Sequence, residues 1–137
     1  MTAARRIGLL LAAVLAATPV AAQPTTDEPH GIAVLNALDK ITGRVSRIEA
    51  AVDRPVEFGT LSVTVRACYA TPPEEAPEAK AFLEVVDHRP DAEPEPVFSG
   101  WMFASSPSVS AMEHPVYDVW VIACKAALPE IDSGKAQ

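Results

Sequence analysis

Apolar and polar side chains alternate along much of the chain, and this alternation predicts β-strands. In residues 61–67 (LSVTVRA) most apolar side chains recur at every second position, which is the period of a half-buried strand. Residues 97–104 and 116–124 are apolar almost throughout, as in buried strands, and a shorter apolar run spans 81–86. These strands follow one another without helices between them, so we expect a mainly β protein.

Residues 38–52 give two conflicting signals. Apolar side chains at positions 38, 41, 45, 48 and 52 follow the three-and-four spacing of a helix. Gly43 and the β-branched residues favour a strand instead. We favour the strand.

The connections between these runs are polar or rich in proline. Residues 71–78 (TPPEEAPE) and 90–96 (PDAEPEP) combine proline with acidic side chains, which predicts long solvated loops. Residues 105–115 (SSPSVSAMEHP) predict one short helical turn capped by Ser106 or Ser108. Together these features predict a small antiparallel β-sandwich or partly open barrel with one short helical turn.

The first 22 residues have the layout of a secretory signal peptide. Arg5 and Arg6 precede an apolar run at 7–17, and small residues up to Ala22 provide a cleavage site. The run is about half of the roughly 20 residues that a membrane-spanning helix needs, so a retained anchor is the weaker alternative. No cysteine stands at the cleavage site, so we expect no lipoprotein. We expect export to the periplasm or secretion, with no permanent membrane span.

Cleavage would leave one domain. We expect a flexible lead-in at 23–34, a single β-rich domain at 35–125 and a flexible tail at 126–137, because both flanks are polar. Without Arg5 and Arg6, 9 Lys and Arg (11 less 2) face 18 Asp and Glu, a formal net charge of −9. Nucleic acids and anionic lipids bind basic surfaces, so we expect neither as a partner.

The chain has two cysteines, Cys68 and Cys124, and both lie in the expected mature part. Exported proteins meet an oxidising environment, so the simplest interpretation is one intramolecular disulfide. A metal pair and a catalytic thiol are the alternatives, but neither the zinc-ligand spacing nor a nearby activating histidine is present. We expect both cysteines to be structural.

Three stretches resemble one family of short exported bacterial proteins, domain of unknown function 2155. They are residues 35–50 (LNALDKITGRVSRIEA), 58–69 (FGTLSVTVRACY) and 98–124 (FSGWMFASSPSVSAMEHPVYDVWVIAC), which cover nearly all of the expected mature domain. The resemblance implies export. It implies no activity, ligand or catalytic residue.

A hydrolase would need a nucleophile, a base and an orienting group. Ser110, His114 and Asp118 supply these residue types, but the serine is not in a G-x-S-x-G motif. His88 and Glu84 are further residues to test for such an activity. A polar turn between two strands explains the serines and His114 more simply. The acidic loops also lack the spacing of a calcium site, so we expect no enzyme, no metal and no cofactor.

The aromatic residues are the more promising feature. Trp101, Tyr117 and Trp120 are the candidate ligand contacts, because aromatic faces on a β-sandwich stack against sugar rings or dock apolar peptides. Burial in the core is the alternative for each tryptophan, and in so small a domain it is the simpler one. We therefore expect a non-catalytic binding or interaction domain of the cell envelope, with an envelope protein or glycan as its partner. A carbohydrate- or peptidoglycan-binding module and a small cell-wall hydrolase are the alternatives.

Overall fold

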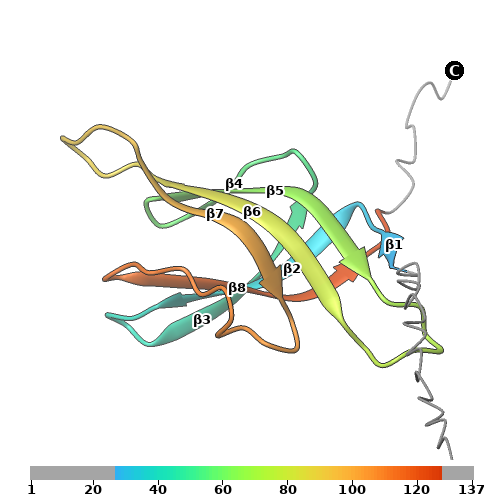
Figure 1. The fold of residues 1–137 in the computed structure, drawn as a ribbon. Coiled ribbons are helices and arrows are strands. Elements are labelled where there is room, and N and C mark those ends of the chain that lie inside the picture. The colour runs from blue at the N-terminus through green and yellow to red at the C-terminus, as the bar shows by residue number, and fades with distance from the viewer. Residues whose placement is uncertain (1–26, 128–137) are drawn as a thin grey trace, which may run out of the picture.

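The described part of the chain folds into eight strands that form two antiparallel sheets. A computed structural model describes residues 27–127, so the expected signal peptide and residues 128–137 of the expected tail lie outside the described part. The strands are β1 (Glu28–Pro29), β2 (Ile32–Asp39), β3 (Arg44–Ala51), β4 (Val56–Phe58), β5 (Leu61–Ala70), β6 (Ala79–Asp87), β7 (Glu95–Phe103) and β8 (Tyr117–Lys125). The two sheets pack face to face and stay open rather than closing into a barrel (Figure 1). The mainly β prediction is confirmed.

The large sheet has the strand order β1-β5-β6-β7, and β4 also pairs with β5. Alternation along β5 places Leu61, Val63 and Val65 in the core with no exposed surface. A bulge between Val65 and Ala67 then shifts the register by one residue, so that Cys68 also faces inward. This shift allows the cysteine to reach the other sheet.

The small sheet has the strand order β3-β2-β8. β2 and β3 form a hairpin whose turn begins at Asp39, where the carboxylate accepts hydrogen bonds from the amides of Ile41 (2.9 Å) and Thr42 (3.2 Å). Gly43 completes the turn with a φ of 70°, a left-handed conformation that favours glycine. The strand interpretation of residues 38–52 is therefore confirmed, although the segment contains parts of two strands rather than one.

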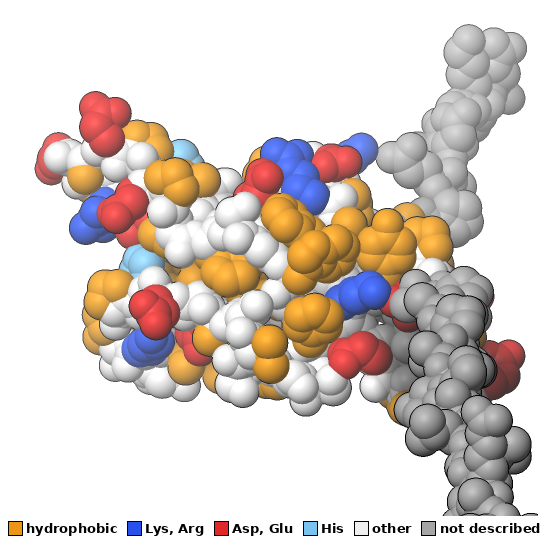
Figure 2. Space-filling model, viewed as in Figure 1, with side chains coloured by type: hydrophobic (Ala, Val, Ile, Leu, Met, Phe, Trp, Pro, Cys, Tyr) orange, Lys and Arg blue, Asp and Glu red, His pale blue; other side chains and the backbone are white. Residues whose placement is uncertain are grey.

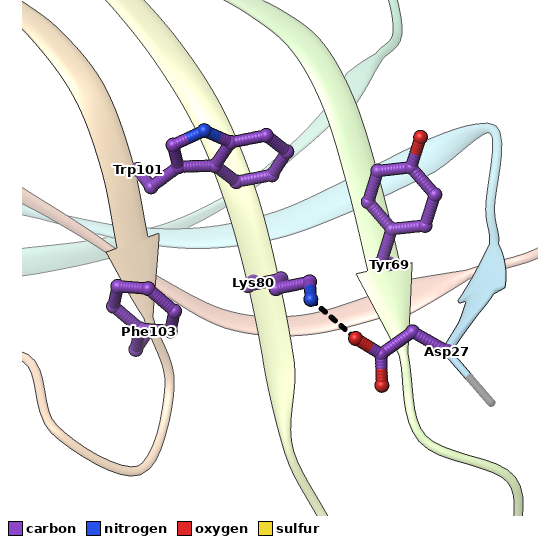
Figure 3. Close-up of a pocket in the computed structure, with 5 residues that line it drawn as sticks. All are labelled: Asp27, Tyr69, Lys80, Trp101 and Phe103. Atoms are coloured by element: carbon purple, nitrogen blue, oxygen red, sulfur yellow. Dashed lines mark ion pairs between the residues drawn. The ribbon is translucent and has the colours of Figure 1, made fainter. Parts of the chain in front are cut away.

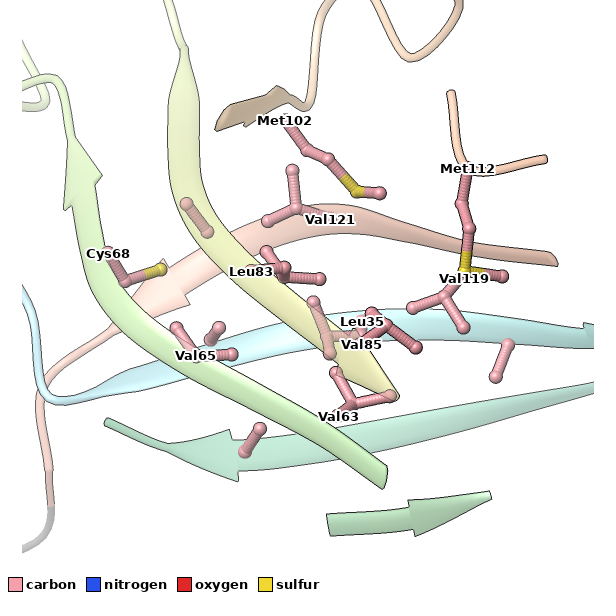
Figure 4. Close-up of a cluster of buried hydrophobic side chains, with 14 of the residues drawn as sticks. Leu35, Val63, Val65, Cys68, Leu83, Val85, Met102, Met112, Val119 and Val121 are labelled. Carbon is pink, nitrogen blue, oxygen red and sulfur yellow. The ribbon is translucent and has the colours of Figure 1, made fainter. Parts of the chain in front are cut away.

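The hydrophobic core lies between the two sheets. It is formed by small and branched side chains that alternate along β2, β5, β6 and β8, and full burial of each large one contributes about 1.5–3 kcal/mol to stability. Figure 4 shows its principal members, Leu35, Val63, Val65, Cys68, Leu83, Val85, Met102, Met112, Val119 and Val121.

Residues 104–116 connect β7 to β8 and contribute Met112 to the core, where it is 3% exposed. The short helical turn predicted in this connection is wrong. Residues 104–116 contain separate turns, closed by bonds from the Ser106 amide to the Phe103 carbonyl (3.3 Å) and from the Val109 amide to the Ser106 carbonyl (3.1 Å). Pro107 has no amide hydrogen with which to continue the first turn.

The sheets begin earlier in the chain than the predicted domain boundary. β1 pairs with the end of β5, and β2 already starts at Ile32, with Ala33 and Val34 buried. Residues 27–34 are thus part of the folded domain rather than of a flexible lead-in. Only three apolar residues precede position 35 there, which is too short a run to predict a strand with confidence from its period.

One covalent bond joins the two sheets. Cys68 of β5 and Cys124 of β8 form a disulfide with a Cα–Cα distance of 5.8 Å, as predicted. Across residues 27–127, no helix is long and apolar enough to cross a membrane.

Candidate functional site

The outer face of the large sheet carries a cluster of aromatic side chains at the end near β1. Tyr69 on β5, Phe82 on β6, and Trp101 and Phe103 on β7 form this aromatic cluster, in which every residue is at least partly exposed. Cross-strand pairing brings them together, since Phe82 lies opposite Trp101. Figure 2 shows the resulting apolar patch on the surface, with a basic side chain within it.

The rings of the aromatic cluster stand at angles to one another. The ring centroids of Trp101 and Tyr69 lie 6.0 Å apart with planes inclined at 39°, and Phe82 meets Trp101 edge to face at 5.5 Å. Trp101 remains 37% exposed. The indole therefore has a ring surface that a ligand can reach.

Lys80 of β6 lies among these rings, opposite Tyr69 on one side and Phe103 on the other. Its ammonium group lies 5.9 Å from the centroid of the Tyr69 ring and forms an ion pair with Asp27 (Figure 3). These five residues, Asp27, Tyr69, Lys80, Trp101 and Phe103, line an open cavity of about 410 Å³. That volume falls within the range of roughly 300–1,000 Å³ that is usual for small-molecule sites.

The arrangement combines two kinds of recognition. The aromatic faces can stack against an apolar or ring-shaped group, while Lys80 offers hydrogen-bond donors and Asp27 offers acceptors in the same cavity. The side chains of Lys80 and Asp27 are 29% and 19% exposed, so a ligand can contact both. We therefore treat this cavity as the candidate binding site.

The three predicted ligand contacts lie in three different places. Trp101 belongs to the aromatic cluster. Trp120 lines a second cavity of about 370 Å³, formed by β8, Leu38 of β2 and residues 107–111 of the β7–β8 connection. Tyr117 packs against Phe58 and against the backbone of Gly59, where any added side chain would collide with its ring.

The remaining members of the candidate site were missed from the sequence. Lys80 and Phe82, like Trp101 and Phe103, are two residues apart on one strand, so each pair shares one face. This spacing could have identified the pairs, but the sequence could not show that both lie on the outer face.

A second polar group lies at the opposite end of the sandwich, where β6 ends. The buried carboxylate of Asp87 accepts hydrogen bonds from the hydroxyl of Thr60 (2.5 Å) and from Nε2 of His114 (2.9 Å). Nδ1 of His114 accepts bonds from the amides of Val116 (3.0 Å) and Tyr117 (3.1 Å), so the ring proton is on Nε2. We call Thr60, Asp87 and His114 the Asp87 cluster.

The hydrogen bonds of the Asp87 cluster determine its charge state. Burial favours the neutral acid, but the bonds from His114 and Thr60, together with the nearby charge of Arg89, outweigh it and lower the pKa of Asp87. His114 makes no hydrogen bond to Ser110 or Asp118, the partners that a hydrolase would require, because both ring nitrogens are already bonded. His88 is exposed, and Glu84 pairs with Arg66 at 3.0 Å.

The two cysteines have a structural role. Cys68 and Cys124 are both in the disulfide. Between residues 27 and 127, no group of three or more His, Cys, Asp or Glu side chains is arranged to hold a metal ion.

Most of this fold lies within a known bacterial protein family. The model of the bacterial family described as "Uncharacterized protein conserved in bacteria (DUF2155)" matches residues 33–124. The chain belongs to the DUF2155 family. The match runs from the first buried residues of β2 to the second cysteine. It includes nearly all of the small sheet, the large sheet apart from β1, the disulfide and four of the five residues that line the candidate site.

Among curated proteins, this DUF2155 chain is similar to "Uncharacterized protein RP359" from Rickettsia prowazekii (strain Madrid E), with 27% identity over 88 residues. The alignment covers 64% of this chain and 57% of the rickettsial protein, so the chain spans little more than half the length of that relative. No solved structure matches.

Proposed function

We propose that this protein is exported and acts as a non-catalytic binding domain of the bacterial cell envelope, with the aromatic cluster as its binding surface. The N-terminal signal pattern and the disulfide support export, because a disulfide persists where thiols are oxidised. The contacts of His114 and the two cysteines support a role without catalysis, since each of these groups is engaged in holding the fold.

The observation that carries the binding proposal is the position of the aromatic cluster on the outer face of the large sheet. The sandwich core is complete without these rings, because it is filled by the inward side chains of the same strands. Exposed Trp and Tyr side chains around a cavity supply much of the binding energy at recognition surfaces. A surface of this kind is therefore suited to a ligand.

One feature favours a saccharide as the ligand. Sugar rings present an apolar face edged with hydroxyl groups, and the cavity matches both parts with the ring of Trp101 and the Lys80–Asp27 pair. An apolar peptide would use the rings but would leave the ion pair without a role. We therefore place glycans, including those of peptidoglycan, ahead of apolar peptides.

Tryptophan fluorescence tests the site and the ligand class together, because the chain contains two tryptophans. Trp120→Phe leaves Trp101 as the reporter, and Trp101→Phe leaves Trp120 as its matched control. We expect muropeptides or soluble glycans to change the emission of the Trp120→Phe protein only. If the emission of neither variant changed, the glycan proposal would be wrong. If only the emission of Trp120 changed, the binding site would be the second cavity.

Export is tested separately by the intact mass of the protein recovered from the periplasm, before and after reduction and alkylation. We expect a mass that corresponds to cleavage after Ala22, with no thiol reactive before reduction. An unprocessed mass or two free thiols would contradict this part of the proposal.

A further inference from the structure

The described edge strands differ in how they avoid pairing with another chain. β1 and β4 are two and three residues long, and β3 has exposed charged side chains at Arg44, Arg47 and Glu49. Short length and charge are the usual protections of a sheet edge. β8 is flanked by residues 107–111 of the β7–β8 connection, which form a cavity with it.

β7 is protected only at its start, by Glu95 and Pro96. It lies at the margin of the large sheet (Figure 1) and is nine residues long, and residues 97–103 (VFSGWMF) include no charged side chain. A long, uncharged edge of this composition is prone to pair with another strand. Its sequence therefore suits an edge that is covered in the working protein.

The backbone groups that face this free edge can be identified. The amide of Ala104 bonds to the Ala79 carbonyl at 2.8 Å and so points toward β6. Alternate residues of a strand direct their backbone groups to opposite sides, so Ser99, Trp101 and Phe103 point away from β6. The Phe103 carbonyl is bonded to the Ser106 amide, whereas residues 27–127 offer no backbone partner to the edge-facing groups of Ser99 and Trp101.

We infer that β7 of a second copy of this chain pairs antiparallel with this edge, around a two-fold axis at Gly100. In that register Ser99 of each copy lies opposite Trp101 of the other, and both residues direct their free amide and carbonyl groups across the interface. The bulge at Val85/Val86 disturbs β7 just before Phe98, which limits the regular ladder to the segment around Gly100.

The side chains of β7 are self-complementary about this axis. On the outer face, a large indole lies opposite a small hydroxyl group at both symmetric positions. At the axis, Gly100 meets Gly100, so no side chains collide there. A two-fold interface requires this kind of match between one surface and itself.

The pairing would join the two large sheets and place the two aromatic clusters on one continuous face. Two ligand sites side by side would favour a repeating ligand over a single unit, through the higher effective concentration of the second site. The pairing itself does not depend on the proposed ligand, because it uses backbone groups and β7 alone.

The oligomeric state of the oxidised protein, measured by analytical ultracentrifugation from micromolar to millimolar concentration, tests the inference. We expect a monomer–dimer equilibrium. Ser99→Pro removes an amide that faces the free edge and leaves the β6 ladder intact, so its dissociation constant should rise roughly tenfold or more while circular dichroism and Tm confirm a folded domain. A monomer throughout, or a dimer that Ser99→Pro does not weaken, would overturn the inference.

A cysteine at position 100 tests the register. Residues that face each other at the axis lie about 4.5 Å apart between Cα atoms, within the span of a disulfide. The space at Gly100 admits a Cβ, whose nearest neighbour would be the Phe98 ring at 3.5 Å. Gly100→Cys should form a covalent dimer under mild oxidation, and Val45→Cys on the opposite sheet should not. Equal cross-linking of both variants, or of neither, would contradict this register.

Discussion

The two ends of the sandwich are fastened to each other by different chemistry. At one end the disulfide between Cys68 and Cys124 joins β5 of the large sheet to β8 of the small sheet. At the other end the Asp87 cluster joins the end of β6 to His114, just before β8 begins. The first fastening is one covalent bond. The second is a set of hydrogen bonds around a buried carboxylate that is 2% exposed.

The difference means that the two ends should respond to different conditions. Reducing agents act on the disulfide and leave the Asp87 cluster unchanged. Acid protonates a carboxylate and leaves a disulfide unchanged. Measurements that separate redox effects from pH effects can therefore assign stability to each end.

The largest effect is expected at the covalent end. Replacing both cysteines by alanine removes a cross-link between residues 56 positions apart, which the chain-entropy model values at about 4 kcal/mol. Urea unfolding of the variant, compared with the reduced and oxidised wild type, measures this loss. The reduced wild type should unfold at the same urea concentration as the variant. A loss of unfolding free energy below about 1 kcal/mol would show that packing, and not the disulfide, holds the two sheets together at this end.

A smaller loss is expected at the hydrogen-bonded end. Asp87→Ala leaves the Thr60 hydroxyl and the Nε2 proton of His114 without their acceptor, which should lower the free energy of unfolding by about 2–4 kcal/mol. Glu84→Ala is the matched control, because this carboxylate is on the same strand but 43% exposed and should contribute little. If both variants lost the same free energy of unfolding, Asp87 would stabilise the fold no more than an exposed carboxylate does.

The pH dependence distinguishes the two ends further. A lowered pKa means that Asp87 stabilises the fold fully above its unfolded pKa of about 3.9 and progressively less as the pH falls through its folded value. The stability difference between wild type and Asp87→Ala should therefore shrink on acidification below about pH 4. The free energy of unfolding of the cysteine-free protein should depend on pH as that of the wild type does. If the difference between wild type and Asp87→Ala did not change across this range, Asp87 would not be the group responsible.

The stability of every variant should still fall in acid, because Glu78 is a second carboxyl group with a lowered pKa. Burial alone would raise the pKa of this carboxyl, but hydrogen bonds from Ser105 and from the Ala79 amide outweigh it and lower the pKa. For this reason the difference between the variants is the quantity to compare, and not either curve alone.

The smallest expected effect is the energetic coupling between the disulfide and the Asp87 cluster. Cys68 lies seven residues beyond Leu61, the β5 residue paired with Asp87, so the two fastenings are separated by about 23 Å of strand. Losses at sites this far apart usually add within about 0.5 kcal/mol. A triple variant that lacks both cysteines and Asp87 tests this additivity, and a larger deviation would mean that the ends unfold as one unit.

The sequence predicted the covalent end better than the hydrogen-bonded end. Two cysteines in a chain with the pattern of an exported protein leave one intramolecular partner for each, so Cys68–Cys124 followed from counting. Asp87 and His114 are 27 residues apart, and nothing local marks them as partners. The sequence groups His114 with Ser110 and Asp118 instead, because these residues are its neighbours along the chain.

The same limit applies to the candidate site and to the hairpin. Trp101 is a candidate ligand contact from the sequence, but its cavity also needs Lys80 from β6 and Asp27 from before β1, which lie beside it only in the folded domain. In the hairpin, Leu38 and Val45 are cross-strand partners, so their spacing resembled a helix although each lies in a strand. The spacing of apolar residues along the sequence does not show which strands pair with one another.

The position of β8 beside β2 has a consequence for the order of events during folding. Within residues 27–127, β2 is the first long strand and β8 the last, yet they are neighbours in the small sheet, with Ile32 opposite Lys125. The centre of the small sheet therefore cannot form until nearly the whole domain is free to fold. Contacts between such distant parts of a chain are slow to form, so the small sheet of a nascent chain would stay incomplete until β8 emerged.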